Sequence, residues 1–202
     1  MSYMGKVTFN GTYEYIISVD NLLEAWQEFV RGKRKRRDVQ EFERDLMTNI
    51  LALHDDLMNK TYQHSPYHAF NISDPKPRNI HKAMNQFRAY AQKESRNHTK
   101  TVWVLKCDIR KFFASIDQNV LIEIINGYVS DTDIQWLIAQ IVSSFHSIQK
   151  GKGLPLGNLT SQLLVNVYMN EFDQFVKHKL KAKYYIRYAD DSVNLDSQKR
   201  LW

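Results

Sequence analysis

The sequence predicts an α+β fold, in which strands and amphipathic helices occupy separate stretches of the chain. Three observations support this prediction. An apolar run ends at Asp108, a long helical stripe follows a glycine-rich loop, and two apolar segments flank Asp190 and Asp191. This order of elements does not alternate strand with helix, so a parallel doubly wound sheet is not expected.

Composition sets the broad class of protein. The 202 residues are 43% hydrophobic, 25% charged and 12% aromatic, which is ordinary for a globular chain and argues against extensive disorder. The net charge of +6 favours polyanionic partners, although many basic proteins never touch nucleic acid. The single cysteine, Cys107, cannot form an intramolecular disulfide, which fits a reducing compartment. No stretch approaches the roughly 20 apolar residues of a membrane span, and no signal peptide is recognised, so a cytoplasmic protein without a membrane partner is expected.

The N-terminal half reads as mostly helical. Asp20 or Asn21 is expected to cap a first helix. Apolar residues spaced by three or four between Val39 and Leu57 predict one long amphipathic helix. Prolines exclude a continuous helix over residues 62–78, and a further helix is predicted over residues 80–93.

The C-terminal half is expected to contain both strands and helices. Residues 101–109 predict a buried strand, because β-branched and aromatic residues dominate the run. Two helices are expected over residues 120–128 and 134–145, then a turn-rich loop over residues 151–157 and a long helix over residues 159–180. Residues 184–195 predict a β-hairpin with the paired acids at or near its turn.

The acids are the main chemical signal. Asp108 ends one apolar strand, and Asp190 and Asp191 lie between two others. Carboxylates beside apolar strands are costly unless a cation or hydrogen bonds compensate them. Carboxylate oxygens are the ligands that Mg²⁺ prefers, so strand ends that carry three acids suit nucleotidyl transfer. By spacing alone, a helix cap at Asp108 and an ordinary turn at Asp190 remain the simpler alternative.

The residues around these acids resemble the motifs of reverse transcriptases. Lys106–Phe113 resembles motif A, Gly153–Gln162 resembles motif B, and Tyr188–Asp191 resembles the YADD form of motif C. All three occur in the family's order, and the resemblance runs from about Tyr62 to Asp191. The nearest branches in pattern are the retron-type, group II-intron-like and diversity-generating enzymes of bacteria.

The resemblance implies a role for each acid. Asp108 and Asp190 would bind two Mg²⁺ ions, with Mn²⁺ as an alternative, while Asp191 would support them and the Ile109 carbonyl would be a further ligand. The expected reaction is RNA-directed DNA synthesis, in which the 3′-hydroxyl of a DNA or RNA primer attacks the α-phosphate of a deoxynucleoside triphosphate on an RNA template.

Four further positions would contact the incoming nucleotide. Phe113 matches the steric gate that excludes a ribose 2′-hydroxyl, with core packing as its alternative. Gly157 would let the backbone approach the nucleotide, and Leu156 replaces the glutamine of many relatives. Gln162 would face the same region, or would serve instead in helix capping.

The remaining expectation concerns nucleic acid. The basic residues expected to bind it are Arg31, Lys33, Arg34, Lys35, Arg36, Arg37, Lys76 and Arg78. For the run from Arg31 to Arg37, a solvated basic surface is the equal alternative.

The resemblance also suggests the domain organisation. Residues 1–100 would form an N-terminal helical region with partial fingers, and residues 101–202 would form the palm with motifs A, B and C. The family's finger segment before motif A is expected to be reduced and the thumb to be missing, which would weaken activity. A catalytically inactive, nucleic-acid-binding remnant is therefore the alternative function, and an antiphage protein on the same fold is a third. The oligomeric state cannot be read from the sequence.

Overall fold

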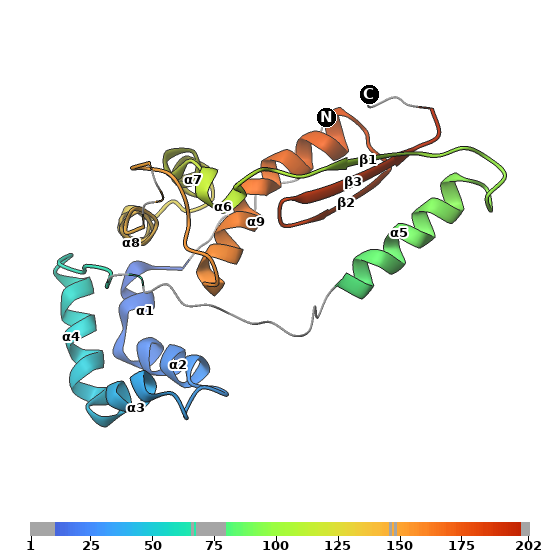
Figure 1. Ribbon diagram of the computed structural model, residues 1–202. Coiled ribbons are helices and arrows are strands. Elements are labelled where there is room, and N and C mark those ends of the chain that lie inside the picture. The colour runs from blue at the N-terminus through green and yellow to red at the C-terminus, as the bar shows by residue number, and fades with distance from the viewer. Residues whose placement is uncertain (1–10, 66, 68–79, 146, 148, 199–202) are drawn as a thin grey trace. The chain divides into compact units, whose positions relative to one another are not determined.

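The computed structural model describes residues 11–65, 67, 80–145, 147 and 149–198. These residues form two compact units, which are drawn in Figure 1. The first unit combines Met1–Pro66 with Ile125–Ser144, and the second combines Tyr67–Ile124 with Phe145–Trp202, each in its described residues. Each unit therefore contains segments that are distant in sequence, and the functional division at residue 100 stays a prediction.

The first unit is helical in its described part. Its helices are α1 (Tyr13–Ile17), α2 (Val19–Phe29), α3 (Arg37–Arg44), α4 (Leu46–Met58) and α8 (Thr132–Ser143), and α7 (Gln118–Asn126) ends in it. The cap of α2 is Ser18, whose Oγ accepts a hydrogen bond from the N–H of Asn21 at 3.3 Å. The prediction of Asp20 or Asn21 as the cap was wrong, because Ser18 holds the extended backbone that a cap requires and Asp20 lies in the first turn.

The predicted helix over residues 39–57 is two helices. Asp45 leaves the helical conformation, with φ −118° and ψ 36°, and separates α3 from α4. The Asn49 side chain donates a hydrogen bond at 3.0 Å to the carbonyl of Phe42, which a continuous helix would pair with the N–H of Leu46. The apolar stripe was predicted correctly, but the hydrogen bond from the Asn49 side chain takes the place of a backbone hydrogen bond between the two helices.

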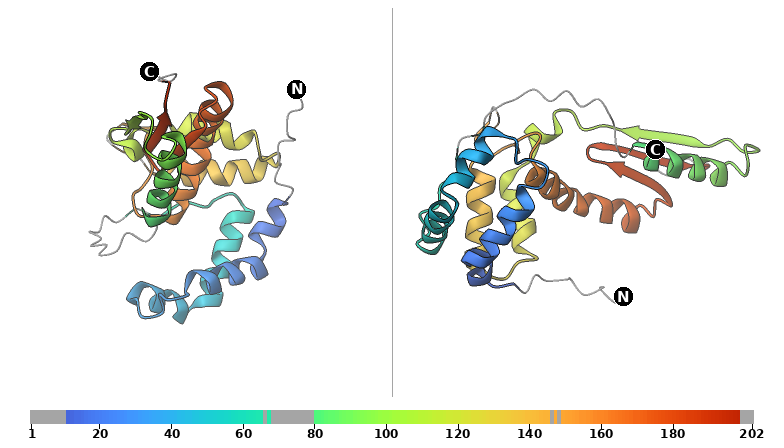
Figure 2. Two further views of the ribbon diagram at one scale, coloured as in Figure 1. Left: turned by 90° about the vertical axis from the view of Figure 1, so that its right-hand side faces the viewer. Right: turned by 90° about the horizontal axis from the view of Figure 1, so that it is seen from below.

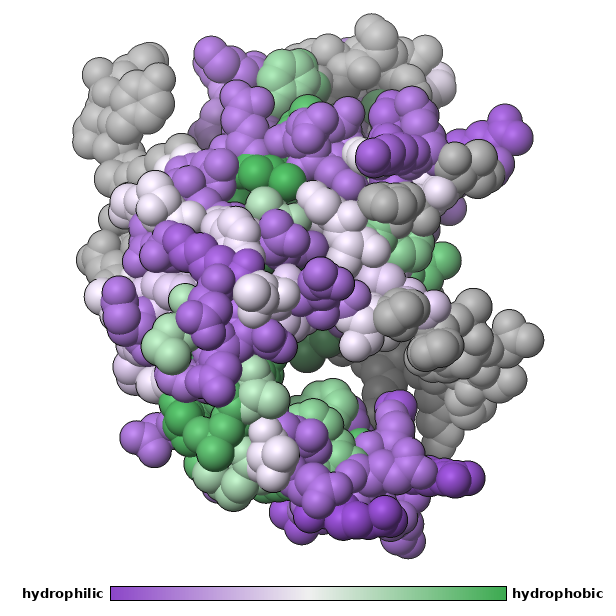
Figure 3. All heavy atoms as spheres, turned by 90° about the vertical axis from the view of Figure 1, so that its left-hand side faces the viewer, coloured by the Kyte–Doolittle hydropathy of each residue, from purple (hydrophilic) through white to green (hydrophobic). Residues whose placement is uncertain are grey.

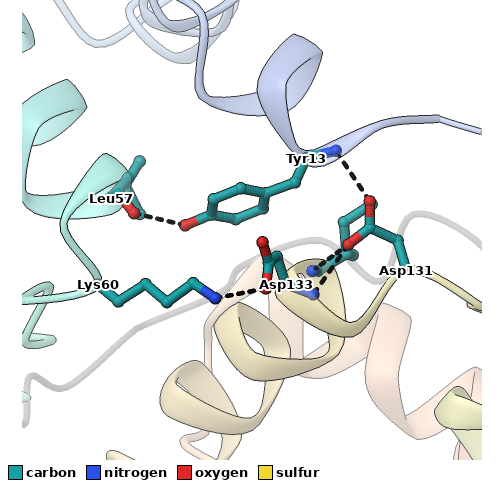
Figure 4. A network of polar contacts seen from close by, with 6 residues as sticks. Tyr13, Leu57, Lys60, Asp131 and Asp133 are labelled. Atoms are coloured by element: carbon teal, nitrogen blue, oxygen red, sulfur yellow. Dashed lines mark hydrogen bonds and ion pairs between the residues drawn. The ribbon is translucent and has the colours of Figure 1, made fainter.

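A polar network joins three segments of the first unit (Figure 4). The Tyr13 hydroxyl donates to the Leu57 carbonyl at 2.7 Å, and the Tyr13 N–H donates to Asp131 Oδ2 at 3.1 Å. Asp131 also caps α8 by accepting from the N–H groups of Asp133 and Ile134. Lys60 forms an ion pair with Asp133. These contacts connect α1, the end of α4 and the start of α8.

We expect Tyr13→Phe to lower the free energy of unfolding by about 1 kcal/mol, because it removes one buried hydrogen bond and leaves the ring in place. Tyr13 is only 4% exposed, whereas Tyr15 in the same helix is 63% exposed, so Tyr15→Phe is the matched control. Urea denaturation of both variants measures the difference. Equal stability of the two variants would show that the Tyr13 hydroxyl does not hold this network.

The second unit contains a three-stranded antiparallel sheet in the order β1-β3-β2. Its strands are β1 (Trp103–Cys107), β2 (Tyr184–Tyr188) and β3 (Asp191–Asp196), and its helices are α5 (Ile80–Glu94), α6 (Phe112–Ser115), α9 (Leu159–Gln174) and the first part of α7. The predicted hairpin and the predicted strand before Asp108 are both confirmed. The long helix also forms, although its last turn is a π-helix over Phe175–Lys179.

The prediction that β1 is buried was wrong. Trp103 is 42% exposed and Val104 is 46% exposed. The reason is topological, since β1 lies at the edge of the sheet and pairs only with β3 among the described strands. A run rich in β-branched and aromatic residues identifies a strand, but it does not determine whether other elements cover it.

Side-chain contacts place different helices on the two faces of the sheet. Tyr184 packs against Tyr90 of α5, with ring centroids 5.1 Å apart. Its neighbour Tyr185 points to the other face and bonds to Asp173 of α9. Figures 1 and 2 show α5 and α9 on either side of these strands. An α+β arrangement with a small antiparallel sheet therefore results.

None of the helices within the described ranges is long and apolar enough to cross a membrane. Hydrophilic residues dominate the face drawn in Figure 3, and smaller hydrophobic areas interrupt them.

Candidate active site

The strand register brings the three predicted acids to one end of the sheet. Cys107, the last residue of β1, pairs with Ser192, so Asp108 directly follows β1 at the end of the sheet where Asp191 begins β3. Tyr188 pairs with Asp191 across the hairpin, which leaves Ala189 and Asp190 as a two-residue turn. Asp108 and Asp191 therefore lie at the same end of the sheet, and Asp190 lies in the adjoining turn.

This end of the sheet is open to solvent. Asp108 is exposed, and the Asp191 side chain is 52% exposed. Lys106 of β1 pairs with Val193, so it lies on the same face of the sheet as Asp191, and its Nζ is 3.5 Å from Asp191 Oδ1. An exposed ion pair of this kind is weak, so a competing cation can displace the lysine.

The donor set fits a divalent cation that is shared with a substrate. Within the described parts of the chain, no three His, Cys, Asp or Glu residues are arranged to hold a metal. Mg²⁺, however, usually takes one or two carboxylates and completes its coordination with water and substrate phosphates. The carboxylates at this end of the sheet would supply that smaller set, and the nucleotide rather than the protein would complete the coordination of the metal.

The hairpin turn is held by side chains that the sequence did not single out. Ala189 has φ 53°, a left-handed conformation that costs a non-glycine residue roughly 1–2 kcal/mol. Its carbonyl accepts a hydrogen bond from Arg187 Nη1 at 3.0 Å. The same guanidinium binds Asp173 of α9, through Nε at 2.8 Å and through Nη2 at 2.8 Å. Tyr185 also donates to Asp173, at 2.7 Å.

The segment after Asp108 is bonded to the glycine-rich loop. The N–H of Leu154 donates to the Phe113 carbonyl at 2.9 Å, and the N–H of Gly153 donates to the Ile116 carbonyl at 2.8 Å. Gln118 is 3% exposed and donates to the Gly153 carbonyl at 3.0 Å. These bonds fix the loop that precedes α9 against the region of the predicted steric gate.

The predicted nucleotide-binding residues lie along this region. Phe113 is half-buried beside Phe112, with ring centroids 5.6 Å apart. Leu156 is 75% exposed, and Gly157 has φ 81°, which favours glycine. Gln162 is exposed and does not cap α9, because Asn158 Oδ1 accepts from the N–H of Thr160 at 3.0 Å. Because Asn158 caps α9, helix capping is excluded as the role of Gln162. Contact of Gln162 with the nucleotide stays a prediction.

The basic run from Arg31 to Arg37 is partly neutralised. Three of its arginines pair with nearby acids, as Arg34 with Glu43 at 3.3 Å, Arg36 with Asp38 at 2.6 Å and Arg37 with Glu41 at 2.8 Å. Lys33 Nζ lies 3.9 Å from the centroid of the Phe29 ring. Arg31 and Lys35 form no ion pair with an acid among the described residues, and both line an open hollow with Gln27. Lys76 and Arg78, also predicted to bind nucleic acid, lie outside the described residues.

The comparison with known families identifies the chain. Residues 44–200 match the family "Reverse transcriptase (RNA-dependent DNA polymerase)". The chain therefore belongs to the reverse transcriptase family, and its small antiparallel sheet with packed helices fits the α+β palm of that family.

Two curated relatives are similar over shorter segments. Protein YkfC of Escherichia coli (strain K12) is 25% identical over 121 residues, which covers 57% of this chain and 31% of the relative. Group II intron-encoded protein LtrA of Lactococcus lactis subsp. cremoris is 33% identical over 87 residues, which covers 41% of this chain and 14% of the relative. The matched part thus spans less than a third of either relative.

Proposed function

We propose that this chain is the catalytic palm of an RNA-directed DNA polymerase that uses Asp108 and Asp190, assisted by Asp191, to hold two divalent cations. The observation that carries the proposal is the strand register, which gathers the acids of motifs A and C at one end of the sheet. Extension of a DNA primer on an RNA template, in the presence of Mg²⁺ and deoxynucleotides, tests it.

The roles of the acids follow from charge. Two cations held by Asp108 and Asp190 would neutralise the triphosphate and stabilise the attacking and leaving oxygens of the displacement. The carboxylates fix where that charge is placed before the primer arrives, and positioning of this kind supplies most of the rate in phosphoryl transfer. The Ile109 carbonyl is a further candidate ligand because it follows Asp108 directly. Asp191 would give up its ion pair with Lys106 and help to hold the two cations.

The loop before α9 would form the nucleotide side of the site. Leu156 presents an exposed apolar side chain, which suits contact with the face of a base. Gly157 has no side chain, so the backbone there can approach the nucleotide closely. Gln162 lies in the first turn of α9 and is exposed. Phe113 would close the sugar subsite, because its carbonyl is bonded to Leu154 at the base of the same loop.

The relatives favour a group II-intron-like branch. The name of LtrA describes a group II intron-encoded protein, and LtrA is 33% identical to this chain over 87 residues. A structured RNA template would then be the substrate class, with a DNA or RNA primer. Purification of the protein with RNA bound, followed by sequencing of that RNA, distinguishes an intron template from unrelated RNA.

We expect nucleic-acid affinity to depend steeply on salt, because phosphate binding releases counterions at about 0.9 per contacted phosphate on duplex DNA. The slope of log affinity against log salt should flatten when Arg31 and Lys35 are both replaced by alanine. Arg36→Ala is the matched comparison, since Asp38 already neutralises that guanidinium. Fluorescence anisotropy at several salt concentrations measures all three proteins. A slope unchanged by the double replacement would make the basic run a solvated surface only.

A catalytically inactive, nucleic-acid-binding protein is the second candidate. The observation that favours it is the ion pair of Asp191 with Lys106, which occupies one of the three acids. The two candidates differ in one result. The inactive protein would bind primer–template with the same salt dependence but would extend no primer with either Mg²⁺ or Mn²⁺.

A further inference from the structure

The turn that presents Asp190 is poorly favoured by its own sequence. A two-residue hairpin turn with a left-handed first residue normally carries glycine there, and this chain has Ala189 with φ 53°. Asp190 follows directly, so its direction depends on the conformation of Ala189. Contacts from outside the turn must therefore hold it.

Arg187 provides such contacts with three of its nitrogens. Nη1 donates to the Ala189 carbonyl at 3.0 Å, while Nε and Nη2 donate to the two oxygens of Asp173, each at 2.8 Å. The Arg187 side chain is 9% exposed and that of Asp173 is 20% exposed. Lysine could not make this planar three-way set of bonds, although it carries the same charge.

Asp173 is held ionised for this role. Burial alone would raise the pKa of Asp173, but hydrogen bonds from Arg187 and Tyr185 and the charge of Arg187 outweigh it, so the pKa is lowered. The hydrogen bond to Asp173 is the largest cause that raises the pKa of Arg187. Both groups therefore stay charged at neutral pH, and the pair is a fixed link between α9 and the hairpin.

The link joins the two sides of the candidate site. The N-terminus of α9 follows the loop that carries Leu156 and Gly157, and Asp173 lies in its last turn. Arg187 and the Ala189 carbonyl belong to the hairpin that carries the acids. One helix thus connects the nucleotide loop, at its start, to the acidic turn, near its end.

We propose that Asp173, Tyr185 and Arg187 form a positioning brace that sets the direction of Asp190 and thereby the affinity of the site for divalent cations. The proposal rests on the proposed function, since it assigns Asp190 to the cation. The three residues contact neither substrate nor cation, and they act through the Ala189 carbonyl. Partners behind a metal ligand typically change metal affinity by about 10–100-fold when they are replaced.

The test measures Mn²⁺ binding by the electron paramagnetic resonance signal of free Mn²⁺, with the full chain, primer–template and a non-hydrolysable deoxynucleotide present. Arg187→Lys is expected to raise the Kd for Mn²⁺ by roughly tenfold. In parallel, primer extension should require a correspondingly higher Mg²⁺ concentration and recover at saturation. A purely structural role would lower thermal stability without moving either cation dependence.

A milder pair of variants guards against misfolding. Tyr185→Phe removes one hydrogen bond to Asp173, whereas Tyr184→Phe alters the adjacent tyrosine, which packs toward α5 on the other face. Only Tyr185→Phe should weaken Mn²⁺ binding. Circular dichroism confirms that each variant is folded.

Asp190→Asn separates the brace from the proposed function. If Asp190→Asn weakens Mn²⁺ binding but folded Arg187→Lys and Tyr185→Phe both bind like the unmodified protein, the brace is overturned and the proposed site stands. If Asp190→Asn itself leaves Mn²⁺ binding unchanged, the proposed site fails, and the brace fails with it. If Asp190→Asn and Arg187→Lys both weaken binding, the positioning role is supported.

Discussion

Asp190→Asn is expected to reduce primer extension on an RNA template by at least about 10²–10³-fold, the range seen when one preorganised charge-stabilising group is removed. Asparagine keeps the size of the side chain and its ability to accept a hydrogen bond, but it removes the negative charge. Asp108→Asn should have a similar effect, because both carboxylates are assigned to the same pair of cations. Single-turnover extension measures the chemical step directly.

The matched control for Asp190→Asn is Asp133→Asn, which removes the same charge in the first compact unit, where Asp133 pairs with Lys60. This control should extend the primer at the unmodified rate. Thermal denaturation should show that Asp190→Asn remains folded, since asparagine has nearly the same size and Asp190 is only half-buried, in the turn between β2 and β3. Extension by Asp190→Asn at the unmodified rate would mean that this carboxylate does not serve the reaction.

Phe113→Ala is expected to raise the incorporation of ribonucleotides relative to deoxynucleotides by roughly 10–100-fold, measured as the ratio of their kcat/KM values. The aromatic ring would occupy the space that a 2′-hydroxyl needs, and alanine leaves that space open. The half-buried position of Phe113 fits a ring that packs on Phe112 along one edge and keeps another edge free.

Phe113→Tyr is the control for the gate, because it retains the ring and should retain the preference for deoxynucleotides. Phe112 is 4% exposed, so Phe112→Ala should instead lower stability by about 3–5 kcal/mol. Nucleotide selectivity therefore tests the role of Phe113, and the free energy of unfolding tests the role of Phe112. A ratio that stays constant in Phe113→Ala would return this residue to its alternative role in core packing.

Local patterns predicted the elements that carry the acids. The apolar run before Asp108 and the paired apolar segments around Asp190 correctly identified β1 and the hairpin, because a strand and a two-residue turn are properties of a few neighbouring residues. The same reasoning failed at Asp45, where the bond from Asn49 to Phe42 divides a continuous apolar stripe. It also failed for the burial of Trp103, which depends on what lies beside the strand.

The brace could not be predicted because it depends on contacts between distant residues. Asp173 and Arg187 are separated by 14 residues and meet only after α9 packs on the sheet. The available signal was that Asp173 follows Val165 and Met169 at four-residue spacing in α9, and both of these are buried, so a charged residue in that register requires a partner. No property of the sequence alone indicated that the partner would be the arginine before the acidic turn.

Anomalous scattering from Mn²⁺ would show whether Asp108 and Asp190 hold the cations of the reaction. Crystals would contain the protein, a primer on an RNA template and a non-hydrolysable deoxynucleotide. We predict two manganese peaks about 3.5–4 Å apart, at coordination distance from carboxylate oxygens of Asp108 and Asp190. Manganese bound to the nucleotide without contact to either carboxylate would contradict the assignment of Asp108 and Asp190 as metal ligands.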